Sequence, residues 1–197
     1  MDFTMVFEHL YIVLISVVMT VLIGLPLGIL AYSWPSFRKV ILWVVDVLQT
    51  IPALALLGII MVFLGAGKLT VIIGLVLYSL LPIVHNTYLG LNGVNPAIKE
   101  AARGMGMTKF YRLVRVELPL AFPVIFTGIR IASVTAIGVA VFATFVGGGG
   151  LGSIIYRGIY IQNMKLLLSG TLTLMAMAVL FDSVMAYVEK RLYRRSS

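Results

Sequence analysis

Cysteine is absent from this chain of 197 residues, and charged residues are scarce, at 11% of the total. Without cysteine, neither a disulfide framework nor a thiolate metal site is possible. The two histidines, His9 and His85, have no clustered acidic or histidine neighbours of the kind that bind metal. A soluble domain of similar length has about a quarter of its residues charged. The low charge therefore argues against an ordinary soluble domain.

Hydrophobic residues make up 61% of the chain, and the mean hydropathy is +1.09. Lipid must cover much of this apolar surface, because one small core cannot bury all of it. We expect an all-α membrane protein with one transmembrane domain over residues 1–197. Each of five apolar segments is long enough to cross ~30 Å of hydrocarbon at ~1.5 Å per residue. The predicted spans are residues 10–31, 40–64 (interrupted at Pro52), 69–89, 118–146 and 166–188.

The basic residues predict the orientation in the membrane. If five helices are threaded, most of the fifteen Lys and Arg fall on one side, in the first loop, the third loop and the tail. Positive loops stay in the cytoplasm, so we expect the N-terminus outside and the C-terminus inside. The net charge of +8 is then a topology signal and not a nucleic-acid surface. The acidic N-terminal segment lacks the basic start of a secretory signal, so we expect the first apolar run to be retained.

Catalytic and nucleotide-binding motifs are not convincing. Gly67-Lys68 is followed by Leu69, where a phosphate-binding loop needs Ser or Thr. Gly147, Gly149 and Gly152 match a dinucleotide-binding spacing, but no strand–turn–helix unit surrounds them. We therefore expect no enzyme activity, and energy must come from a partner or an ion gradient.

The segment 95–117 is the polar exception, and we expect it to lie in the cytoplasm. Asn95-Pro96 is a good helix start, with Asn as the cap and Pro at the first position. The helix should end at Gly104 and Gly106, and Thr108 should cap a second one. On these grounds alone the segment is either a docking surface or a basic loop attracted to anionic lipid.

The spacing of Glu100-Ala101-Ala102, Gly106 and Leu118-Pro119 resembles the EAA loop of ABC importer permeases. Within that family the chain is similar to permeases for osmoprotectants such as glycine betaine, carnitine and choline. The resemblance also covers LQTIPALALLGI (48–59), LPIVHNTYLGLNGV (81–94), EAARGMGM (100–107) and FVGGGGLGSIIYRGI (145–159).

This resemblance implies a MetI-like type I importer permease fold with five spans and a cytoplasmic coupling helix, in a bacterial or archaeal cytoplasmic membrane. The implied partners are cytoplasmic ABC ATPase subunits, a second permease subunit and an extracytoplasmic substrate-binding protein. ATP and magnesium would bind the ATPase, and this chain would hold no cofactor. The residues implied to contact the ATPase are Glu100, Ala101, Ala102, Gly104 and Gly106.

Within the predicted spans, Asp46, Arg130 and Asp182 are costly to bury, and we expect Arg130 to pair with Asp182 or Asp46. Their role is either to lock helices together or to take part in gating. Polar or irregular backbone points are candidates for the pore or its gate: Gln49, Thr50 and Pro52, and the run Gly147, Gly148, Gly149 and Gly150. Two alternatives stay open, a methionine-type permease and an ion-coupled carrier that uses Asp46, Arg130 and Asp182.

Overall fold

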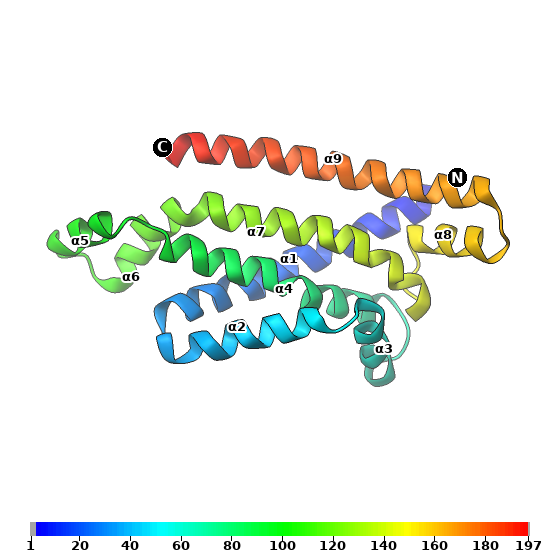
Figure 1. The fold of residues 1–197 in the computed structure, drawn as a ribbon, viewed down its shortest axis with the longest axis horizontal. Helices are drawn as coiled ribbons and strands as arrows, with labels where there is room; N and C mark the ends of the chain where they lie inside the picture. Colours follow the sequence, from blue (N-terminus) through cyan, green and yellow to red (C-terminus); the bar gives the residue numbers. More distant parts are fainter. Residues whose placement is uncertain (1–2, 197) are drawn as a thin grey trace.

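The computed structural model describes residues 3–196 and is helical throughout those residues, apart from short turns. Seven long or medium helices are joined by shorter elements (Figure 1). In chain order they are α1 (Phe3–Ser33), α2 (Pro35–Thr50), α3 (Ala53–Leu64), α4 (Lys68–Asn92), α5 (Pro96–Gly104), α6 (Lys109–Arg112), the π-helix η1 (Leu113–Glu117), α7 (Leu118–Val139), the 3-10 helix η2 (Ala140–Val146), α8 (Leu151–Tyr160) and α9 (Met164–Ser196).

The central packing unit consists of α1, α4 and α7, with α4 in contact with both of the others. The main core joins Ile12 and Val13 of α1 to Leu75 of α4 and Ile137 of α7, all at most 1% exposed. Glycines bring these helices close together. A Cβ on Gly28 of α1 would lie 2.9 Å from the Val84 carbonyl oxygen of α4. The small residue at this position therefore serves helix packing, as its spacing from Gly24 indicates.

Four helical stretches, Phe3–Ser33, Lys68–Asn92, Lys109–Val146 and Met164–Arg194, are long and apolar enough to cross a membrane. The segment expected as a single span over residues 40–64 is two helices, α2 and α3, bent by 99°. The predicted interruption at Pro52 is therefore present, and it is a full break between two helices and not a mild kink. Ile51 is extended, because the residue before a proline is pushed out of the helical region, and Pro52 itself has φ of −55° and ψ of 129°.

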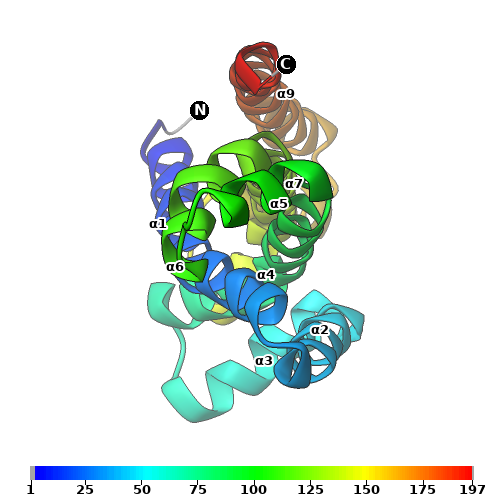
Figure 2. The same cartoon turned by 90° about the vertical axis from the view of Figure 1, so that its left-hand side faces the viewer.

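The broken pair still leads from one end of the bundle to the other. In Figure 1, α2 runs from the end where α5 and α6 lie toward the end where α8 lies, and α3 turns aside there. Within residues 3–196 there are four candidate spans, or five if the α2–α3 pair is one span, which is compatible with the five apolar segments. The bundle carries α2 and α9 on separate sides when it is viewed along this axis (Figure 2).

One other predicted span changes its type of helix before its end. The stretch 118–146 is an α-helix only to Val139 and continues as the 3-10 helix η2. Residues 153–165, which lie outside the predicted spans, form most of the short helix α8 and the turn into α9.

Candidate functional site

The helix α5 stands at one end of the bundle, beyond the ends of α4 and α7 (Figures 1 and 2). Its start is capped as the sequence predicts, because Asn95 Oδ1 accepts a hydrogen bond from the backbone N–H of Ala97 at 2.9 Å. Gly106 has φ of +80°, which glycine adopts without strain, and the chain turns there. Thr108 then accepts a hydrogen bond from the Tyr111 N–H and caps α6. The predicted pair of short helices is confirmed.

Polar contacts of two basic side chains support this pair of helices. The Lys99 ammonium donates to the Leu91 carbonyl at 2.8 Å and lies 5.1 Å from the centre of the Tyr32 ring. At the return into α7, Arg112 Nε donates to Glu117 at 2.5 Å, and the Glu117 side chain is 1% exposed. The first contact joins α5 to the ends of α4 and α1, and the second braces the return from α6 into α7.

The outward surface of α5 carries most of the residues expected to contact a partner. Glu100, Ala101, Gly104 and Gly106 are exposed. Ala102 is different, because it is 1% exposed and packs inside the chain. Its small side chain therefore lets α5 approach its own bundle and is not available to another protein. The exposed surface also includes apolar side chains that the motif does not contain, Met105 at 70% and Phe110 at 77% exposure.

Arg130 of α7 joins two carboxylates of α9. Its guanidinium donates to both oxygens of Asp182, with Nε–Oδ1 and Nη2–Oδ2 distances of 2.7 and 2.9 Å. Its Nη1 donates to Glu189 Oε2 at 2.8 Å, and Glu189 also accepts from the Thr127 hydroxyl. Of the two pairings expected for Arg130, the one with Asp182 is confirmed. Asp46 lies elsewhere, with Oδ1 3.0 Å from His85 Nε2 of α4 but without the geometry of a hydrogen bond.

The predicted polar point of the second span lies at the break between α2 and α3. Gln49 is half-buried, while Thr50 is exposed and its hydroxyl donates to the Val47 carbonyl at 2.7 Å. Pro52 precedes the first residue of α3 and is also exposed. The geometry shows a polar, irregular backbone at this point, and its role in a pore stays a prediction.

The run Gly147–Gly150 connects η2 to α8 at the end opposite to α5 (Figure 1). Gly147, Gly149 and Gly150 have positive φ, so three of the four positions need glycine for conformation. The Gly150 N–H donates to Glu8 Oε2 of α1 at 3.0 Å. Glu8 also forms an ion pair of 2.6 Å with Lys68. The glycine run is thus fastened to the starts of α1 and α4, and a gating role for it stays a prediction.

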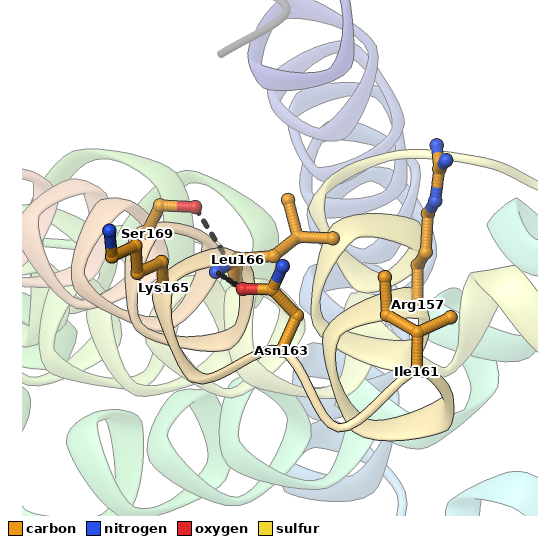
Figure 3. A pocket seen from close by; sticks show the side chains of 6 residues that line it. All are labelled: Arg157, Ile161, Asn163, Lys165, Leu166 and Ser169. Atoms are coloured by element: carbon orange, nitrogen blue, oxygen red, sulfur yellow. Dashed lines mark hydrogen bonds between the residues drawn. The ribbon is translucent and has the colours of Figure 1, made fainter.

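A shallow hollow lies where α8 turns into α9, and Figure 3 shows the side chains around it. Asn163 Oδ1 accepts from the Leu166 N–H at 3.1 Å, and the Ser169 hydroxyl donates to the Leu166 carbonyl at 2.8 Å. The Asn163 bond caps the start of α9, whereas the Ser169 bond lies within its first turns. The cationic side chains of Arg157 and Lys165 lie on separate sides of the hollow and do not converge (Figure 3). Within residues 3–196, no group of three or more His, Asp or Glu could hold a metal ion.

Sequence reasoning missed four of these charged partners: Glu8, Lys68, Glu117 and Glu189. For Glu189 a signal exists, because it lies seven residues after Asp182 and so on the same face of α9. The Arg112–Glu117 pair has a weaker signal, since five residues separate partners on the same side only in the wider turn of a π-helix. Glu8 and Lys68 are far apart in the sequence, and only the fold brings them together.

Comparison with protein families places most of the chain in one of them. Residues 21–194 match the model of the family described as "Binding-protein-dependent transport system inner membrane component". The chain is 40% identical over 186 residues to the choline transport system permease protein OpuBB of Bacillus subtilis (strain 168), covering 94% of this chain and 86% of that protein. It is 44% identical over 187 residues to the glycine betaine/carnitine/choline transport system permease protein OpuCD of the same strain, with 94% and 82% covered.

A similar relative occurs in Salmonella typhimurium (strain LT2), whose osmoprotectant import permease protein OsmW is 39% identical over 184 residues. That match covers 91% of this chain and 86% of the relative. Among solved structures, an inward-facing form of the MetNI methionine ABC transporter is similar with a TM-score of 0.86 at 24% identity. It covers 94% of this chain and 93% of that one, which confirms the MetI-like fold.

Proposed function

The chain belongs to the binding-protein-dependent transport family of inner membrane components, and from this premise we propose that it forms a pore through which quaternary ammonium osmoprotectants are imported. The observation that supports this proposal most strongly is the sequence identity of 39–45%, along nearly the whole chain, to permeases of choline, glycine betaine, carnitine and osmoprotectant systems. Membership in this family favours an ATP-driven importer over the ion-coupled carrier.

We propose that α5 is the coupling helix and that a cytoplasmic ABC ATPase binds its outward surface. Glu100, Ala101, Gly104 and Gly106 are exposed there, with the apolar side chain of Met105 beside them. Glycine and alanine permit close approach of another backbone, and Met adapts its shape to a neighbouring surface. ATP and magnesium bind the ATPase in this assembly, and the permease itself carries out no chemical step.

The mechanical connection follows from the contacts behind α5. Lys99 fastens α5 to the end of α4 and lies beside Tyr32 of α1, and the Arg112–Glu117 pair braces the return from α6 into α7. Closure of two ATPase subunits would therefore move these helices together and open the pore toward a substrate-binding protein on the outer side. A second permease subunit, identical or related, completes the pore.

The function is tested with the complete complex of permease, ATPase and binding protein in lipid vesicles. We expect ATP hydrolysis to rise when the loaded binding protein is added with glycine betaine, carnitine or choline, and to stay at its basal rate with methionine. Stimulation by methionine alone would overturn the assignment to osmoprotectants. Uptake by the purified chain without an ATPase would overturn the importer.

A further inference from the structure

Asp46 is a charged side chain in an exposed position on a membrane helix. It lies eleven residues into α2, roughly 16 Å from the start of that helix at ~1.5 Å per residue. Its side chain is 52% exposed, and its neighbour across the helix pair, His85, is 32% exposed. A carboxylate at such a depth almost always faces the bundle interior or water and not lipid. The side of the α2–α4 pair that bears Asp46 therefore faces away from the bilayer.

The two flanks of α2 differ in polarity. This difference is a separate reason to place the side that bears Asp46 away from the bilayer. At ~100° per residue, Arg38, Asp46 and Gln49 lie on one flank, with Trp43 and Thr50 beside them. The opposite flank is purely apolar, and its side chains are exposed at 39–59%. Lipid suits the apolar flank. That flank consists of Phe37, Val40, Val44 and Val47.

The neighbouring helix α4 continues the polar flank with aromatic rings. Tyr78, His85 and Tyr88 are spaced by seven and three residues, so they lie on one face of α4, and all three are partly exposed. At the end of this face near α5, Arg38 donates to the Tyr88 hydroxyl at 2.8 Å and lies 5.7 Å from the centre of its ring. Asp46 is the only acidic residue in α2 and α4.

We propose that this strip of α2 and α4, bearing Trp43, Asp46, His85 and Tyr88, lines the translocation path, and that the Asp46 carboxylate contacts the ammonium group of the solute in transit. The inference rests on the proposed function and adds a recognition point to it. A fixed carboxylate beside aromatic faces is the chemistry that attracts quaternary ammonium groups. Because the carboxylate is half exposed, the contact is weak enough for the solute to leave. The second permease subunit would close the path on the other side.

The charge of the solute provides the test. Choline has a net positive charge, whereas glycine betaine carries an ammonium group and a carboxylate and is neutral overall. In vesicles holding the full complex, we expect Asp46→Asn to reduce the uptake of choline relative to that of glycine betaine by about tenfold. Asp46→Glu, which keeps the charge, should restore most of the ratio. Affinities of both solutes for the binding protein alone should not change.

The absence of cysteine allows a second measurement that does not depend on transport. Single Gln49→Cys and Thr50→Cys variants should react with a water-soluble thiol reagent from within the path, and saturating choline should slow the reaction. Val44→Cys, on the apolar flank, should stay unreactive. An unchanged uptake ratio in Asp46→Asn, or faster labelling at Val44 than at Gln49 and Thr50, would overturn the inference. A wild-type complex that takes up neither solute would overturn the proposed function as well.

Discussion

At the scale of single residues, the single positive charge of Arg130 pairs with two carboxylates. One guanidinium faces the carboxylates of Asp182 and Glu189, with donor–acceptor distances of 2.7–2.9 Å. Without the guanidinium, two carboxylates would repel each other across the α7–α9 contact. Much of the side chain of Asp182 is exposed, so the contribution of each bond is moderate.

We expect Arg130→Gln to weaken the docking of α9 and to lower the thermal stability of the purified permease complex. Asp182→Asn should lower it less, because Arg130 then keeps its bond to Glu189. The double variant should be less harmful than the two single effects combined. Thermal unfolding followed by tryptophan fluorescence measures all three. If Arg130→Gln assembled and unfolded like the wild type but did not transport, the residue would serve gating and not helix docking.

Gly128 and Gly138, both in α7, allow a closely packed glycine to be compared with one that has free space around it. A Cβ on Gly128 would lie 2.5 Å from the Pro82 carbonyl oxygen and 2.7 Å from the Asn86 Cβ, both on α4. A Cβ on Gly138, ten residues later, would meet no atom within 4 Å. We expect Gly128→Ala to destabilise the fold by about 1–3 kcal/mol through overpacking.

Gly138→Ala should be neutral or stabilise by up to about 1 kcal/mol, because alanine favours the helix. The two variants are compared by unfolding in detergent with a denaturant. Equal stability of both variants would show that α4 and α7 pack less closely at Gly128 than the structure has them.

At the scale of elements, α5 depends on its cap. The nine residues of this helix are too few to be stable alone in water. Asn95→Ala removes the side-chain bond to the Ala97 N–H and should cost about 1 kcal/mol of local helix stability. We expect the variant complex to hydrolyse ATP while transporting less solute per ATP. The measurement is the ratio of uptake to hydrolysis in vesicles.

Asn92→Ala is the control for this prediction. Asn92 is also exposed and lies three residues earlier, but it ends α4 and does not cap α5. Its ratio of uptake to hydrolysis should match the wild type. If both variants lost coupling equally, the effect would come from the loop as a whole and not from the start of α5.

At the scale of the whole molecule, the orientation is a prediction from the basic residues. In the structure, the turn after α8 lies at one end of the bundle, and α5 and α6 lie at the other (Figure 1). We expect Tyr160→Cys, at an exposed position of α8, to react with a membrane-impermeant maleimide on intact cells. Lys190→Cys, near the end of α9, should react only after the membrane is opened. The reverse pattern would invert the topology.

The sequence alone determined the class, the number of apolar segments and the pair of short helices capped by Asn95 and Thr108. These features depend on local chemistry: the length of apolar runs, the capping by Asn95 and Thr108, and the turn at Gly106. The spacing of Glu100, Ala101 and Gly106, by which the chain resembles ABC importer permeases, is also read from the sequence alone. Each of these signals lies within about thirty residues, so no knowledge of neighbouring helices was needed.

Only the tertiary structure decided which distant groups meet and which face each residue takes. Arg130 had two acidic candidates within the predicted spans, and the contact of α7 with α9 selected Asp182 and left Asp46 beside His85. Ala101 and Ala102 are identical in chemistry, but the docking of α5 buries only the second. The 99° bend at Pro52 likewise depends on where α3 packs, because a proline permits a bend without setting its angle. Such choices follow from the packing of the whole bundle and are not visible in the local pattern of the chain.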